Sequence, residues 1–204
     1  MPFFLRISIL PDLSTHEIQR SILFMPIPYI FKSDRLGFRA WAKADIEKMA
    51  EINGDKEVME FFPGVKTYDE TVAFIGRMQR QLLDKGYCYF ALDKLDDGEL
   101  IGFIGVSDQV FEASFTPCVD IGWRLSRKEW GKGFATEGAK RCLQYAFEEL
   151  RIGKVYAMAP VINISSEQVM RKIGMKKLRD FVHPLLSGND RLKQCALYEI
   201  SRTG

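Results

Sequence analysis

Two spacings of apolar residues alternate along the chain and predict a fold of strands and helices. Short apolar or alternating runs, bounded by turn residues, are typical of strands. Apolar residues that recur about every 3.6 positions are typical of helices that pack one face on a sheet. Strands are expected over residues 36–41, 87–92, 100–107, 118–125, 155–161, 177–182 and 194–200, and helices over 44–52, 67–85, 135–150 and 165–174.

Caps and turns mark where several of these elements begin and end. Thr67 or Asp69 is expected to cap the second helix, and Gly86 is expected to end it. Asp96-Asp97-Gly98 predicts a tight hairpin between two strands. Hairpins come early in the chain and strand–helix units come late. The pattern therefore predicts one mixed α/β domain of the α+β type, over residues 34–204.

Residues 1–33 differ from the rest and are expected to form an N-terminal extension of unknown role. The apolar run from Met1 to Ile9 is too short to span a bilayer and lacks the basic flank of a signal peptide. Two interpretations stay open. The extension packs on the domain or on a partner, or the true start of the protein is Met25.

Composition narrows the class of protein without naming a function. The 204 residues are 47% hydrophobic and 27% charged, which is ordinary for a globular domain. The net charge of +2 is too small to indicate a nucleic-acid or membrane partner. The four cysteines show no spacing typical of a metal site, so we expect reduced thiols, no metal and a cytoplasmic location.

The most specific local signal is a glycine-rich turn, Trp130-Gly131-Lys132-Gly133-Phe134-Ala135-Thr136, which follows the apolar strand 119–125. A strand, a glycine turn and a helix start together expose backbone N–H groups that suit a phosphate. Simple strand-to-helix geometry explains the glycines equally well. The spacing does not complete the patterns of a P-loop or of a dinucleotide-binding turn.

This turn resembles the acetyl-CoA pyrophosphate loop of the GNAT superfamily of N-acyltransferases, written [QR]xxGx[GA]. Trp130 takes the first position, Gly133 the central glycine and Ala135 the last, as in the subgroup similar to ribosomal-protein alanine N-acetyltransferases. Residues 36–39, 99–105, 119–123, 163–166 and 172–175 resemble other motifs of the family, in family order. The resemblance implies a mostly antiparallel sheet of six to seven strands, splayed in the middle and flanked by helices. It also implies transfer of an acetyl group from acetyl-CoA to a primary amine.

The same resemblance implies where the co-substrate acetyl-CoA binds. In the family, two strands diverge beside Leu125, pantetheine lies in the gap, and a main-chain N–H near Leu125 faces the thioester oxygen. Asn163 matches a residue that contacts pantetheine, although a helix-entry role suits Asn equally well. The implied cofactor residues are Arg124, Leu125, Ser126, Trp130, Gly131, Lys132, Gly133, Phe134, Ala135, Thr136 and Asn163.

Asp120 and Ser166 are the implied catalytic residues. Asp120 stands where the family often carries a glutamate, and it can take a proton from the attacking ammonium. A structural pair with Arg124 competes with that role, because residues four apart on a strand share a face. Met170 stands where many relatives carry a tyrosine that protonates the thiolate. The acid is then Ser166, water or Tyr198.

The acceptor amine is a protein N-terminus or a small molecule, and its site is expected in the helical region and in the loop 183–192. Phe61, Phe62, Tyr68 and His183 are the candidate residues, although core packing or a surface role is an alternative for each. A homodimer through edge strands is possible. A non-catalytic acyl-CoA-binding protein and an ordinary nucleotide-binding α/β protein remain as competing functions.

Overall fold

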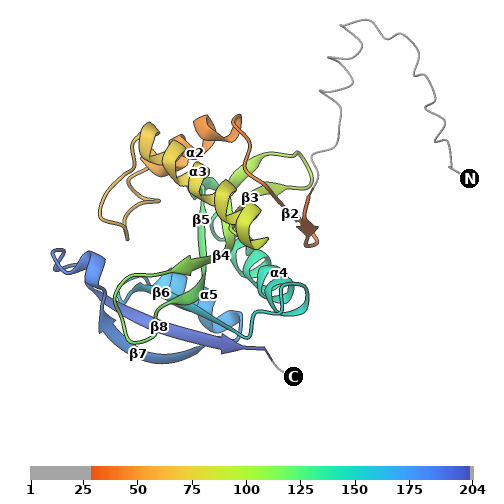
Figure 1. The fold of residues 1–204 in the computed structure, drawn as a ribbon. Coiled ribbons are helices and arrows are strands. Elements are labelled where there is room, and N and C mark those ends of the chain that lie inside the picture. Colours follow the sequence, from red (N-terminus) through yellow and green to blue (C-terminus); the bar gives the residue numbers. More distant parts are fainter. Residues whose placement is uncertain (1–28, 203–204) are drawn as a thin grey trace, which may run out of the picture.

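The computed structural model describes residues 29–202 as one central sheet covered by helices on both faces (Figure 1). The expectations for Met25 and for the first 28 residues lie outside the described residues. The sheet has eight strands in the order β1-β2-β3-β4-β5-β6-β8-β7. They are β1 Phe31–Lys32, β2 Leu36–Arg39, β3 Tyr89–Lys94, β4 Leu100–Gln109, β5 Cys118–Leu125, β6 Lys154–Pro160, β7 Lys176–Val182 and β8 Gln194–Ser201.

The sheet has one strand more than the six to seven expected. The additional strand is β1, which holds only two residues and pairs with β2 at the edge of the sheet. A two-residue run is too short to give a periodic signal in the sequence. Phe31 is nonetheless buried, and its ring stacks on those of Phe38 and Tyr145 at centroid distances of 4.3 and 4.2 Å.

All neighbouring strands pair antiparallel except β5 and β6, which are parallel. Those two strands share a single pair of aligned residues, Asp120 and Tyr156, whereas β4 and β5 are paired along eight positions. Beyond Asp120 the two strands therefore diverge. The splay implied by the sequence resemblance is present, and it leaves one edge of β5 unpaired toward its carboxyl end.

The helices are α2 Asp45–Gly54, α3 Tyr68–Lys85, α4 Phe134–Glu148 and α5 Ile164–Lys172. Phe74 of α3 packs on Phe103 of β4, with ring centroids 5.2 Å apart. Helix α4 covers the opposite face, because Gly138 lies so close to Ile104 that an added Cβ would stand 2.5 Å from it. Neighbouring residues of a strand point to opposite faces, so the contacts of Phe103 and Ile104 place α3 and α4 on different sides of the sheet.

Local signals in the sequence set most element ends. Thr67 caps α3 in a capping box with Glu70, as one of the two expected caps, and Gly86 ends the helix in the left-handed conformation at φ 77°.

The four cysteines are free, and three of them are buried. No helix among residues 29–202 is long and apolar enough to cross a membrane.

A buried ion cluster lies beneath α2. The Arg39 guanidinium donates to both carboxylate oxygens of Asp45, at 2.6 and 2.9 Å, and to both oxygens of Asp93, at 2.6 and 2.8 Å. All three side chains are less than one-tenth exposed. Although burial opposes its charge, the hydrogen bonds to the two carboxylates raise the pKa of Arg39 above its usual value. The cluster joins β2, β3 and the first turn of α2.

Candidate functional site

The glycine turn leads from β5 into α4 through a short 3-10 helix, η1 Arg127–Glu129. Gly131 and Gly133 both have positive φ, at 74° and 85°, which other residues rarely adopt. Gly133 is the N-cap of α4, and no side chain caps the helix there. The first backbone N–H groups of α4 therefore lack a side-chain acceptor, and they form a positive helix end suited to an anion.

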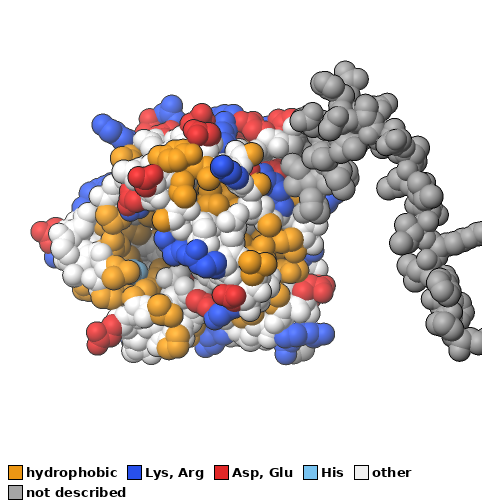
Figure 2. All heavy atoms as spheres, turned by 45° about the horizontal axis from the view of Figure 1, so that its top comes forward, with side chains coloured by type: hydrophobic (Ala, Val, Ile, Leu, Met, Phe, Trp, Pro, Cys, Tyr) orange, Lys and Arg blue, Asp and Glu red, His pale blue; other side chains and the backbone are white. Residues whose placement is uncertain are grey.

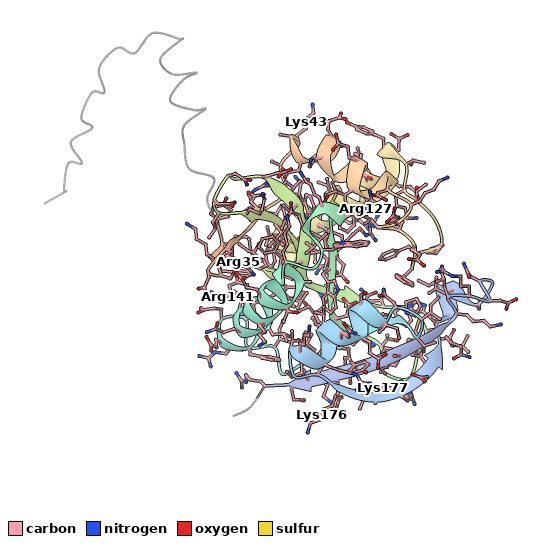
Figure 3. The ribbon with its side chains drawn as sticks, turned by 180° about the vertical axis from the view of Figure 1, so that it is seen from behind. Arg35, Lys43, Arg127, Arg141, Lys176 and Lys177 are labelled. Atoms are coloured by element: carbon pink, nitrogen blue, oxygen red, sulfur yellow. The ribbon has the colours of Figure 1, made fainter. Side chains whose placement is uncertain are left out.

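Arg35 fixes the turn from the side, beside α4 (Figure 3). Its guanidinium pairs with Glu137 at 2.6 Å and donates to the carbonyl oxygen of Lys132 at 3.2 Å. The Lys132 ammonium pairs with buried Glu129 at 3.0 Å. Lys132 of the turn and Arg35 beside it both have a carboxylate partner. The backbone N–H groups are therefore the main donors that the turn offers to a ligand.

A cavity of about 520 Å³, called here the loop cavity, opens at this turn. Most of the expected cofactor residues line it. Ser126 and Lys132 do not, and the Lys132 ammonium is paired with Glu129. The expected residues on its wall are Arg124, Leu125, Trp130, Gly131, Gly133, Phe134, Ala135, Thr136 and Asn163.

The strand register orients the backbone beside this cavity. Ser126 donates to Ile101, and hydrogen-bonded positions alternate along an antiparallel pair. The amides of Trp123 and Leu125 therefore point away from β4, toward the gap between β5 and β6. This is the position that the sequence resemblance implies for a donor to a thioester oxygen.

A second cavity of about 590 Å³, called here the strand cavity, lies on the other side of that gap. It is lined by residues of α2, α3, β5 and β6, among them Asn53, Arg77, Asp120 and Met158. Figure 2 shows one face of the molecule with a hollow in it, and hydrophobic side chains flank this hollow. The two cavities meet at six shared residues: Phe61, Phe62, Trp123, Arg124, Asn163 and Ser166.

Asp120 is a buried carboxyl group on the wall of the strand cavity. Its Oδ1 accepts from the Tyr89 hydroxyl at 2.6 Å and from the Gln109 amide at 3.1 Å. Burial raises the pKa of Asp120 to about 6, and the two hydrogen bonds offset part of that effect. Among the described residues no donor reaches Oδ2. Asp120 therefore combines a raised pKa with a position at a cavity, which is typical of functional carboxyl groups.

Arg124 lies on the same face of β5, but it does not pair with Asp120. Between them Gly122 leaves room for the ring of Tyr89, which would stand about 3.1 Å from an added Cβ. Arg124 instead donates from Nη1 to Asn53 at 2.6 Å, and it stacks on Phe62, 4.1 Å from the ring centroid. Burial lowers the pKa of Arg124 to about 10. The competing prediction of an Asp120–Arg124 pair was wrong, because Tyr89 separates the two side chains.

Asn163 and Ser166 come to the junction of the cavities through the start of α5. Asn163 is the N-cap, and its side chain accepts from the Ser166 N–H at 3.1 Å. The helix-entry role of Asn163 is therefore present together with a place on both cavity walls. Met170 is buried on the wall of the strand cavity. Tyr198 donates to Glu167 at 2.5 Å and lines neither cavity, so its position does not favour it as an acid.

Of the four residues expected at the acceptor site, two lie at the junction and two do not. Phe61 and Phe62 line both cavities. Tyr68 is 48% exposed in the first turn of α3 and lines neither cavity. His183 packs its ring on Phe111, 4.4 Å between centroids, and accepts from the Leu185 N–H. Tyr68 and His183 were expected at the acceptor site because they lie in the helical region and in the loop 183–192, and neither side chain lines the two cavities.

Three residues of the site had not been singled out from the sequence. Tyr89 and Asn53 hold Asp120 and Arg124 from β3 and α2, and Glu129 holds Lys132 beneath the loop cavity. Tyr89 has no motif around it. The signal nearest to it in the sequence is Gly122 of β5, because an added Cβ there would stand about 3.1 Å from the ring.

Comparisons with known proteins agree with this architecture. A family model described as an acetyltransferase (GNAT) domain matches residues 35–176. The uncharacterized protein YkkB of Bacillus subtilis is 34% identical over 160 residues, which cover 75% of this chain and 90% of YkkB. The putative ribosomal N-acetyltransferase YdaF of the same organism is 34% identical over 110 residues, 53% of this chain and 55% of YdaF.

Solved structures show the same fold. A GNAT-family acetyltransferase from Bacillus anthracis has a TM-score of 0.70 at 29% identity, covering 83% of this chain and 96% of that one. Spermidine N-acetyltransferase from Vibrio cholerae, in complex with CoA and spermine, has a TM-score of 0.64 at 19% identity, covering 82% and 95%. With the family match over residues 35–176, these findings show that the chain belongs to the GNAT family of acetyltransferases.

Proposed function

We propose that this protein transfers an acetyl group from acetyl-CoA to a primary amine by direct attack in a ternary complex. The observation that carries the proposal is the meeting of two cavities where β5 and β6 diverge. Such a junction holds two reactants against each other, and orientation of this kind supplies much of the rate of a two-substrate reaction. The acceptor is a protein N-terminus or a small-molecule amine.

The residues of the loop cavity fit acetyl-CoA. The N–H groups from Gly131 to Thr136 suit its pyrophosphate, and the unpaired edge of β5 suits its extended pantetheine arm. When bound, acetyl-CoA supplies an activated acetyl group and a thiol leaving group. The Leu125 N–H, whose direction is set by the β4–β5 register, polarises the carbonyl without needing to move.

Asp120 acts as the general base in this proposal. A pKa of about 6 leaves its carboxylate ionised at neutral pH, and a base poised near the working pH is efficient. It takes the proton that the ammonium must lose before its nitrogen bonds to the acetyl carbon. The Ser166 hydroxyl lines both cavities and is the candidate donor to the sulfur as the carbon–sulfur bond breaks.

The descriptions of two relatives include the acceptor of each, and they do not identify the acceptor of this chain. YdaF is described as a putative ribosomal N-acetyltransferase, and the Vibrio cholerae enzyme as a spermidine N-acetyltransferase. The competing function is an acyl-CoA-binding protein that has lost catalysis. Its support is Met170, since no phenol stands there to protonate the thiolate.

Thiol release from acetyl-CoA over a panel of amines and N-terminal peptides tests the activity. We expect kcat/KM to rise with pH to a plateau above about 6, and Asp120→Asn to lower it by about 10²- to 10⁴-fold and remove the acidic limb. Binding of acetyl-CoA without release for any acceptor would favour the non-catalytic function. An acidic limb that survives in Asp120→Asn would exclude Asp120 as the base.

A matched pair of glycine substitutions tests the cofactor site separately. Gly131 and Gly98 have similar positive φ, at 74° and 71°, and an added Cβ meets nothing within 4 Å at either position. Both alanine variants carry the same backbone strain. Only Gly131→Ala places a methyl group at the loop cavity. We therefore expect about a tenfold loss of acetyl-CoA affinity in Gly131→Ala and none in Gly98→Ala, measured by calorimetry.

A further inference from the structure

Arg124 is a partly buried cation without a carboxylate partner among residues 29–202. Its Nη1 donates to the neutral side chain of Asn53, and its Nε is shielded from solvent with no hydrogen-bond partner. The rings of Phe62 and Phe103 cover the guanidinium, 4.1 and 5.3 Å from their centroids. A shielded N–H without an acceptor costs free energy that a hydrogen bond normally offsets. The remaining donors of Arg124 therefore favour an anionic partner that is not part of the protein.

The other charges of the strand cavity do not supply that partner. Glu70 is engaged by the Lys66 ammonium at 2.8 Å and by the Thr67 N–H at 2.9 Å. Arg77 also lines the cavity and forms no ion pair among the described residues. Asp120 is held on Tyr89 and Gln109, away from Arg124. Apart from the Lys66–Glu70 pair, the cavity thus has two guanidinium groups without an ion pair and one carboxyl group, that of Asp120, at its walls.

The charged groups at the wall of the strand cavity favour some classes of acceptor over others. A polyamine carries only positive charges, and it would bring two or more of them beside Arg124 and Arg77. An amine with an anionic group would instead offer each end a complementary partner, the nitrogen at Asp120 and the anion at Arg124. A guanidinium presents a planar fork of donors that matches a carboxylate.

We propose that the acceptor is an amine that also carries a carboxylate, with Arg124 binding the carboxylate and the strand cavity selecting against polyamines. The inference rests on the proposed function and names the substrate class of the same site. Asn53 keeps the guanidinium in place without neutralising it. Phe62 and Phe103 cover part of it, and this lowers its contact with water and strengthens its interaction with an anion.

Matched acceptors test the proposal directly. The probes are amino acids, the corresponding amino amides, aminoalkyl phosphates and spermidine, each assayed by thiol release. In the unsubstituted protein we expect kcat/KM for the amino acids to exceed that for the amides by about 10- to 100-fold, the range of a charge-assisted hydrogen bond. Aminoalkyl phosphates equal to the amino acids would broaden the ligand to oxyanions and would overturn the assignment of a carboxylate.

Three variants separate a binding role from a structural one. Arg124→Gln and Asn53→Asp should each abolish the preference for amino acids over amides, the first by removing the cation and the second by pairing it internally. Arg80→Gln is the control, because Arg80 is an exposed residue of α3 that lines neither cavity. It should keep the preference unchanged. Asn53→Asp retains Arg124, so it tests the proposal even where Arg124→Gln fails to fold.

The outcomes distinguish this inference from the proposed function. Thiol release with equal or better use of amides and spermidine would overturn the inference and leave the acetyltransferase proposal intact. A rise in the KM of acetyl-CoA in Arg124→Gln, with the preference for amino acids unchanged, would assign Arg124 to the cofactor and overturn the inference as well. No acetyl-CoA binding and no release with any amine would overturn both.

Discussion

Two arginines of this protein, Arg39 and Arg124, have opposite surroundings. Arg39 is bound by two carboxylates, each through two hydrogen bonds, within the packed region beneath α2. Arg124 has the neutral Asn53 and two aromatic rings around it, and it lines both cavities. The pKa of Arg39 is raised by its carboxylate partners, whereas burial lowers that of Arg124 to about 10.

A structural charge and a charge that serves binding differ in where their counter-charge lies. A guanidinium that serves only the fold is expected to have its partners inside the fold, as Arg39 does. A guanidinium that is held in place, partly shielded from water and left without a counter-charge reduces the stability of the free protein. Such an environment is expected where a bound ligand supplies the missing negative charge.

Removal of Arg39 gives the largest expected effect on stability. Arg39→Met would leave Asp45 and Asp93 buried without a cation, and breaking such a cluster costs about 3–5 kcal/mol of unfolding free energy. Urea denaturation at pH 7 measures it. A loss below about 1 kcal/mol would mean that the cluster contributes little, and the contrast with Arg124 would disappear.

Asp120→Asn is expected to stabilise the protein at neutral pH. The folded state raises the pKa of Asp120 from about 4 to about 6, so it binds more protons than the unfolded state between those values. The contribution of Asp120 to stability is therefore present below pH 4 and is lost as pH rises through 6. Asparagine removes this loss, and the gain at pH 8 is on the order of 2 kcal/mol.

The measurement is the melting temperature of Asp120→Asn and of the unsubstituted protein from pH 4 to pH 8. The difference between the two should grow through that range and then level off. A difference that is constant with pH would show that Asp120 is not buried in its charged form, and the variant would then act only through hydrogen bonding.

Arg124→Met gives the smallest expected effect on stability. Methionine retains an apolar side chain against Phe62 and Phe103 and removes a cation that has no carboxylate partner. We expect the free energy of unfolding to change by less than about 1 kcal/mol, or to increase. Urea denaturation beside Arg39→Met supplies the test. A loss as large as that of Arg39→Met would show that Arg124 stabilises the fold.

Features set by neighbouring residues could be predicted from the sequence. The Thr67 cap, the end of α3 at Gly86 and the glycine turn before α4 each depend on a few consecutive residues, and each was placed correctly. The splayed sheet was implied by the family resemblance. Local geometry of this kind needs no knowledge of what packs against it.

The interior of the site could not be predicted in the same way. The contact from Arg124 to Asn53 joins residues 71 positions apart, and the Tyr89 ring reaches Asp120 across Gly122 of β5. Such contacts depend on side-chain directions and on the space left between strands. Sequence spacing suggested that Asp120 and Arg124 meet because it carries no information about the ring between them.

The divergence of β5 and β6 has a mechanical consequence. The sheet consists of two parts, β1 to β5 and β6 with β8 and β7, joined along the sheet by a single aligned pair, Asp120 and Tyr156. The proposed base therefore stands at the point where the ladder of β5 continues into β6. An extended ligand in the gap would pair with the free edge of β5 and would lengthen the contact between the two parts of the sheet.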